Sequence, residues 1–77
     1  MSNGQEQVEI YIHKDMDVSR RSWLVAKLEQ EQGIIGAWFE DGNHHRLTVH
    51  YERDHFSHIT LLDTIKLEGF QGEIVGD

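Results

Sequence analysis

The chain has 77 residues, of which 38% are apolar, and a formal net charge of −7 from fourteen acidic and seven basic residues. This length predicts one domain with a modest core. The acidic balance disfavours contact with nucleic-acid phosphates, and the absence of cysteine excludes disulfides and thiolate metal sites. The sequence contains no run of about 18 apolar residues that would predict a membrane span. The first seven residues lack the basic and apolar regions of a signal peptide, so we expect a cytoplasmic protein.

The first half of the chain predicts a strand followed by a helix. Residues 1–7 are polar and are expected to form a flexible tail, ahead of a single domain over residues 8–77. Apolar and polar residues alternate over residues 8–13, which predicts a half-buried strand. The helix is expected to begin after Ser19 as its N-cap and to end near Gln32.

A hairpin is predicted in the middle of the chain. Residues 34–40 have the composition of a strand, and Gly36 allows a bulge within it. After that bulge, Ala37 and Phe39 are expected to face the core. The Asp-Gly-Asn sequence at residues 41–43 is typical of a hairpin turn.

The last third of the chain repeats the order strand, helix, strand. Alternation over residues 47–52 predicts the third strand. Ser57 is the expected N-cap of a second helix, which is expected to stop at Gly69. Alternation then resumes over residues 70–75 as a fourth strand.

Two strand–helix–strand units joined by a hairpin predict an α+β fold. Right-handed crossovers place the strands in a four-stranded antiparallel sheet of order 4-1-3-2, with both helices on one face. This arrangement is the ferredoxin-like βαββαβ sandwich. It buries the apolar stripes of two helices against a single sheet.

Core and turn residues distributed over residues 8–76 also carry a resemblance. They are Leu28, Gly33-Ile34, Leu47-Thr48-Val49-His50-Tyr51, Ser57, Leu61-Leu62, Ile65, Gly69-Phe70 and Ile74-Val75. This pattern resembles the heavy-metal-associated domains of copper chaperones and metal-transporting ATPases. In that family the first loop carries a Cys-x-x-Cys metal motif, whereas residues 13–20 of this chain contain no cysteine. The resemblance therefore implies a fold, together with metal handling or docking to a domain of similar shape, but no copper(I) site.

Histidine and carboxylate side chains are expected to gather at one end of the sheet. The topology brings the loop after the first strand close to the hairpin between the second and third strands. The candidate metal ligands there are His13, Asp15, Asp17, His44 and His45. Imidazole and carboxylate ligands suit a divalent transition metal such as Zn, Ni or Cu(II). The alternative is that these are solvated loop residues, with Asp17 or Ser19 capping the helix.

Aromatic residues form a second candidate site, on the open face of the sheet. Tyr11 and Trp38 are expected to project there, with His50 facing out near Glu9 or Tyr11. Because their outward neighbours are mostly acidic, this face is a poor platform for RNA and a better one for a protein partner or a homodimer. The alternative is a pair of isolated surface aromatics that needs no partner.

The sequence predicts no enzyme. It has neither a phosphate-binding loop nor a nucleophile elbow, and no carboxylate pair is expected in a cleft. We therefore expect a small non-enzymatic binding module that holds a divalent metal through histidine and aspartate. The alternative is a protein-interaction or regulatory module without metal, which uses the open sheet face or the edge strand at residues 34–40.

Overall fold

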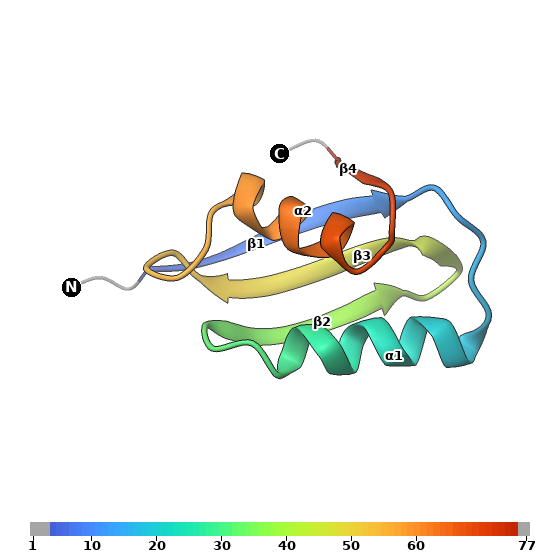
Figure 1. Cartoon of the computed structure of the whole chain (residues 1–77), viewed down its shortest axis with the longest axis horizontal. Coiled ribbons are helices and arrows are strands. Elements are labelled where there is room, and N and C mark those ends of the chain that lie inside the picture. The colour runs from blue at the N-terminus through green and yellow to red at the C-terminus, as the bar shows by residue number, and fades with distance from the viewer. Residues whose placement is uncertain (1–3, 76–77) are drawn as a thin grey trace.

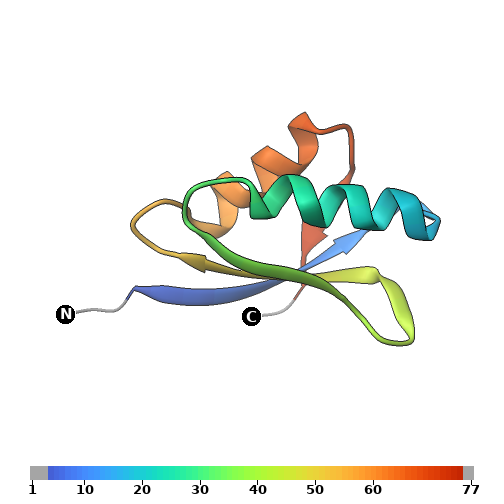
Figure 2. The ribbon, with the colours of Figure 1, turned by 90° about the horizontal axis from the view of Figure 1, so that it is seen from below.

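The computed structural model describes residues 4–75 as a four-stranded antiparallel sheet with two helices packed on one face (Figures 1 and 2). The elements are β1 (Gln5–Ile12), α1 (Val18–Glu29), β2 (Ile34–Glu40), β3 (Asn43–Glu52), α2 (His58–Leu67) and β4 (Gly72–Ile74). The strand order is β2-β3-β1-β4, which is 4-1-3-2 read from the opposite edge, so β2 and β4 are the edge strands. Within the described residues, neither helix is long and apolar enough to cross a membrane.

The first strand begins earlier than the sequence predicts. Residues 5–7, expected in a flexible tail, belong to β1, whereas residues 1–3 lie outside the described part of the chain. The reason is the length of β3, which continues to Glu52 and offers partners to Gln5 and Gln7, opposite Glu52 and His50. Backbone pairing across the sheet therefore outweighs the polar character of these residues.

The N-cap of α1 is Asp17, which the sequence offered as an alternative, and the expected cap Ser19 lies inside the helix. The Asp17 backbone is extended and its Oδ1 accepts a hydrogen bond from the Arg20 backbone N–H at 2.9 Å. A carboxylate is well suited to this position because it satisfies a free N–H group and interacts favourably with the helix dipole. The helix also ends at Glu29 rather than near Gln32.

Gly33 belongs to the turn into β2, four residues beyond the end of α1. Its φ is +100°, and its carbonyl oxygen accepts a hydrogen bond from the Glu52 backbone N–H at 2.8 Å. A left-handed conformation at this position reverses the chain direction between α1 and the edge strand. Glycine is suited to this conformation, although Gly33 does not end the helix itself.

The edge strand β2 has the predicted bulge and orientation. The register with β3 shifts between Ile34 and Gly36. Beyond it Ala37 is buried against the helices and Phe39 is half-buried, whereas Trp38 is 46% exposed. The two strands are joined by a tight turn in which Gly42 has a φ of +80°.

The second helix and the core follow the sequence pattern closely. Ser57 and Thr60 form a capping box, in which each side chain accepts a hydrogen bond from the other's backbone N–H. One face of α2 then buries Leu61 and Ile65. The core between helices and sheet consists of Val8, Ile10, Ile12, Leu24, Leu28, Ala37, Leu47, Val49, Tyr51, Leu61, Ile65 and Phe70.

Candidate functional site

Three loops meet at one end of the sheet, as the topology predicts. The β1–α1 loop, the β2–β3 turn and the α2–β4 loop all lie at the right-hand end of the molecule in Figure 1. A surface hollow of about 450 Å³ opens between the first two of these loops. Its lining includes four of the predicted ligands, Asp15, Asp17, His44 and His45.

The closest contact in this hollow joins His45 to Asp15. Nε2 of His45 lies 2.9 Å from Asp15 Oδ1, and Nδ1 lies 2.7 Å from the carbonyl oxygen of Ile12. Both ring nitrogens thus face oxygen atoms of β1 or of the loop that follows it. The imidazole also stacks on the ring of Tyr11, with centroids 5.3 Å apart. His45 is therefore held in one orientation by β1 and by the loop that follows β1.

The other predicted ligands do not converge on His45. Asp17 is occupied as the N-cap of α1, and His44 is exposed at the hollow. His13 lies against the edge of the Tyr11 ring, and its Nε2 is 3.7 Å from Glu73 Oε2 on β4. Within residues 4–75, no group of three His, Cys, Asp or Glu residues is placed to hold a metal ion.

The open sheet face carries the predicted aromatic residues around a central arginine. Arg46 lies between two carboxylates, with Nη1 3.5 Å from Glu9 and Nε 3.7 Å from Glu40. Trp38 is directly opposite Thr48, which is only 6% exposed although it lies on this face. Arg46 thus partly neutralises the negative charge of Glu9 and Glu40 on this part of the face.

His50 does not have the predicted neighbours. It lies opposite Gln7 on β1 and Gly36 on β2, instead of beside Glu9 or Tyr11. The cause is the early start of β1, which sets a register that the predicted strand over residues 8–13 could not reveal. Tyr11, Trp38 and His50 therefore come from three strands, and the ring contacts of Tyr11 are with His13 and His45.

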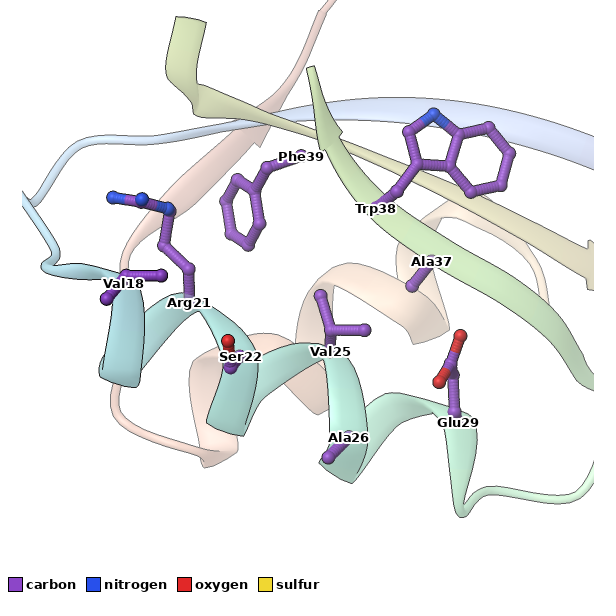
Figure 3. Close-up of a pocket in the computed structure, with 9 residues that line it drawn as sticks. All are labelled: Val18, Arg21, Ser22, Val25, Ala26, Glu29, Ala37, Trp38 and Phe39. Atoms are coloured by element: carbon purple, nitrogen blue, oxygen red, sulfur yellow. The ribbon is translucent and has the colours of Figure 1, made fainter. Parts of the chain in front are cut away.

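An apolar groove of about 470 Å³ lies between α1 and the edge strand β2 (Figure 3). We call it the α1–β2 groove. It is lined by Val18, Arg21, Ser22, Val25, Ala26 and Glu29 of α1 and by Ala37, Trp38 and Phe39 of β2.

This groove was not predicted, although α1 carries a signal for it. One helix face is shared by residues spaced by four, three and four positions: Val18, Ser22, Val25 and Glu29. That face lies beside the buried residues Leu24 and Leu28. Val18 remains 65% exposed.

A buried tyrosine marks a further polar cluster at the other end of the sheet. The hydroxyl of Tyr51 donates to Glu6 Oε1 at 3.2 Å, and Arg53 and His58 also approach the Glu6 carboxylate. Burial, together with this hydrogen bond and the nearby carboxylate charge, raises the pKa of Tyr51 to about 12. This cluster was not predicted, because Glu6 was expected to lie in the flexible tail.

Comparison with models of known protein families and with the sequences of curated proteins finds no match. Functional inference therefore depends on the surfaces of the chain itself. Two are suitable for recognition: the α1–β2 groove, which is mainly apolar, and the Asp15–His45 pair, which is polar. They lie on different parts of the fold and imply different ligands.

Proposed function

We propose that this protein is a non-enzymatic protein-binding module that recognises its partner through the α1–β2 groove and the adjoining edge of β2. The observation that carries this proposal is an apolar groove beside β2, which is an edge strand of the sheet that residues 4–75 form. An unpaired strand edge offers backbone N–H and C=O groups to an added strand. The groove next to it offers an apolar surface for the side chains of that strand.

Exposed apolar side chains along this edge support a protein ligand. Three exposed large apolar residues lie on or beside β2, namely Val18, Ile35 and Trp38. Such a concentration is typical of protein-interaction sites. The acidic net charge favours a protein over a nucleic acid as the ligand.

The order of elements supports the ferredoxin-like βαββαβ fold as the scaffold for this function. In this arrangement β2 lies at an edge and α1 runs alongside it on the helix side of the sheet, so the groove follows from the fold. The resemblance to heavy-metal-associated domains is consistent with such a scaffold. We take it as an indication of shape, because the chain lacks the thiolates of that family.

Affinity capture with matched surface variants tests the proposal. Val25→Glu places a carboxylate in the apolar part of the groove, whereas Leu67→Glu places one on α2, where Leu67 is 87% exposed. We expect wild type and Leu67→Glu to retain the same partner, identified by mass spectrometry and rebound in purified form. Val25→Glu should lose it while keeping its circular dichroism spectrum. Equal retention by both variants would contradict the proposed surface.

A divalent metal at the loop end is a second candidate function. The observation that favours it is the hydrogen bond from His45 Nδ1 to the Ile12 carbonyl, which orients Nε2 toward Asp15. Histidine ligands in metal sites are commonly oriented in this way. His44, which lines the same hollow, is a further ligand candidate for Zn, Ni or Cu(II).

NMR titration with each metal separates this candidate from the first. If the site binds metal, the His45 ring signals should shift or broaden to saturation at one equivalent, and His45→Ala should abolish the change. His50→Ala, on the open sheet face, is the control and should leave the titration unchanged. The absence of a saturable change at micromolar metal would remove this candidate and leave the groove proposal intact.

A further inference from the structure

We infer that the partner of the α1–β2 groove is a second copy of this chain, related to the first by a two-fold axis that places the two β2 strands antiparallel. This inference rests on the proposed function, and it specifies the partner. An antiparallel pair of edge strands joins two four-stranded sheets into one of eight strands. Three properties of the groove favour a second copy over an unrelated protein.

The charges at the two ends of the groove are opposite. Arg21 lies near the start of α1 beside Val18 and Phe39, whereas Glu29 lies in the last turn beside Ala37 (Figure 3). A two-fold axis at Trp38, which lies between Phe39 and Ala37 on β2, exchanges the two ends. It therefore sets Arg21 of each copy against Glu29 of the other, which makes two favourable contacts between identical surfaces.

The two charged side chains are available for such contacts. Arg21 Nη1 donates to the carbonyl oxygen of Met16 at 2.6 Å, which fixes the guanidinium at its end of the groove, and its other N–H groups form no hydrogen bond within residues 4–75. Among residues 4–75, Glu29 forms no ion pair. The groove lining is thus neutral overall on a chain whose net charge is −7. Two acidic molecules repel each other least through such a surface.

The residues of β2 are also self-complementary about this axis. Trp38 is 46% exposed on the open face, and the axis places the Trp38 rings of the two copies opposite each other. Ala37 and Phe39, on either side of Trp38, face the helices. The axis places Ala37 of each copy opposite Phe39 of the other, so a small apolar residue lies across from a large one.

Charge reversal tests the two-fold arrangement directly. We expect wild type to sediment as a dimer over a concentration series in analytical ultracentrifugation. Arg21→Glu and Glu29→Arg should each weaken dimerisation by about tenfold or more, because each places like charges together at both contacts. An equimolar mixture of these two variants should recover the dimer, since one then contributes two carboxylates and the other two guanidinium groups. The double variant Arg21→Glu/Glu29→Arg should also dimerise by itself.

Controls separate this pairing from a general effect of net charge. Glu31→Arg changes the net charge as Glu29→Arg does, and Lys66→Glu changes it as Arg21→Glu does, yet neither residue lines the groove. Both should sediment as wild type. Circular dichroism and thermal melting must show that every variant is folded.

Three results would overturn the inference. They are a monomeric wild type at millimolar concentration, a dimer insensitive to both reversals, and failure of the mixture to recover the dimer that each variant lost. A monomeric wild type that still binds a captured partner through Val25 would overturn the self-pairing alone and leave the proposed function standing. If the wild type is monomeric and no captured partner depends on Val25, both proposals are overturned together.

Discussion

Tyr51 and Glu6 lie directly opposite each other on β3 and β1, and the tyrosine hydroxyl donates to the carboxylate at 3.2 Å. The same carboxylate lies 3.3 Å from Arg53 Nη1 and 3.4 Å from His58 Nε2, at the start of α2. One side chain at the beginning of the first strand thus links two central strands to the second helix. The phenol itself is almost fully buried beneath that helix.

We predict that this buried phenol makes the protein less stable at alkaline pH. The pKa of Tyr51 is raised from 10.0 to about 12 by burial and by Glu6, so the folded state prefers the neutral phenol. This contribution is fully present below pH 10 and is lost as the pH rises toward 12. A rise of this size corresponds to a loss on the order of 2–3 kcal/mol.

Urea denaturation at several pH values between 8 and 12 measures this loss. Tyr51→Phe should reduce the steepness of the alkaline decline in the free energy of unfolding. Near neutral pH it should cost about 1 kcal/mol, the typical value of one hydrogen bond. Glu6→Gln should reduce the steepness only in part, because burial is the larger cause. An unchanged decline in Tyr51→Phe would refute the assignment.

Two polar residues at the start of α1, Asp17 and Ser19, test the assignment of its N-cap. Asp17→Ala should lower the free energy of unfolding by about 1 kcal/mol, because it removes the acceptor of the Arg20 N–H group. Ser19→Ala should have little effect, since Ser19 is exposed inside the helix. Chemical denaturation of both variants provides the measurement, and a larger effect at Ser19 would restore the cap that the sequence suggested.

Gly33 and Gly42 both have positive φ but differ in their surroundings. A Cβ at Gly33 would lie 2.6 Å from Cγ of His55, whereas one at Gly42 would meet nothing within 4 Å. Gly42→Ala should therefore cost only the backbone strain, about 1–2 kcal/mol. Gly33→Ala should cost more, because His55 must also move. Equal losses in thermal denaturation would show that His55 moves aside freely.

Two leucines of α2 test how burial determines the energetics of one helix. Leu61 is fully buried, whereas Leu67 is 87% exposed. Leu61→Ala should lower the free energy of unfolding by about 2–5 kcal/mol through lost transfer energy and a residual cavity. Leu67→Ala should stay within about 0.5 kcal/mol of wild type. A comparable loss at both positions would indicate that Leu67 is covered in solution.

The turns, caps and boundaries of the elements differ in how well the sequence predicts them. The capping box of Ser57, the bulge before Ala37 and the glycine turn at residue 42 were all predicted, since each depends on local backbone chemistry. The boundaries of β1 and α1 were predicted less well. Whether residues 5–7 form a strand depends on β3, which lies about forty residues away in the chain.

The candidate sites likewise include contacts that the sequence predicts and contacts that it does not. The sequence placed Asp15 and His45 at one end of the sheet, and the structure brings them into contact. It left open whether Asp17 or Ser19 caps the helix and could not show that His13 faces Glu73, because both depend on loop geometry. The α1–β2 groove was not predicted, because helix periodicity shows which residues share a face but not what lies opposite that face.

The sequence by itself determined the type and order of the elements, one apolar face for each of them, and a chain without thiolate chemistry, since these properties depend on periodicity, turn residues and composition. Only the tertiary structure decided the register of β1, the pairing of Glu6 with Tyr51, and the groove between α1 and β2. The physical reason is that these features arise between segments distant in the chain. Their free energy depends on how the helices pack on the sheet, and no local sequence pattern contains that information.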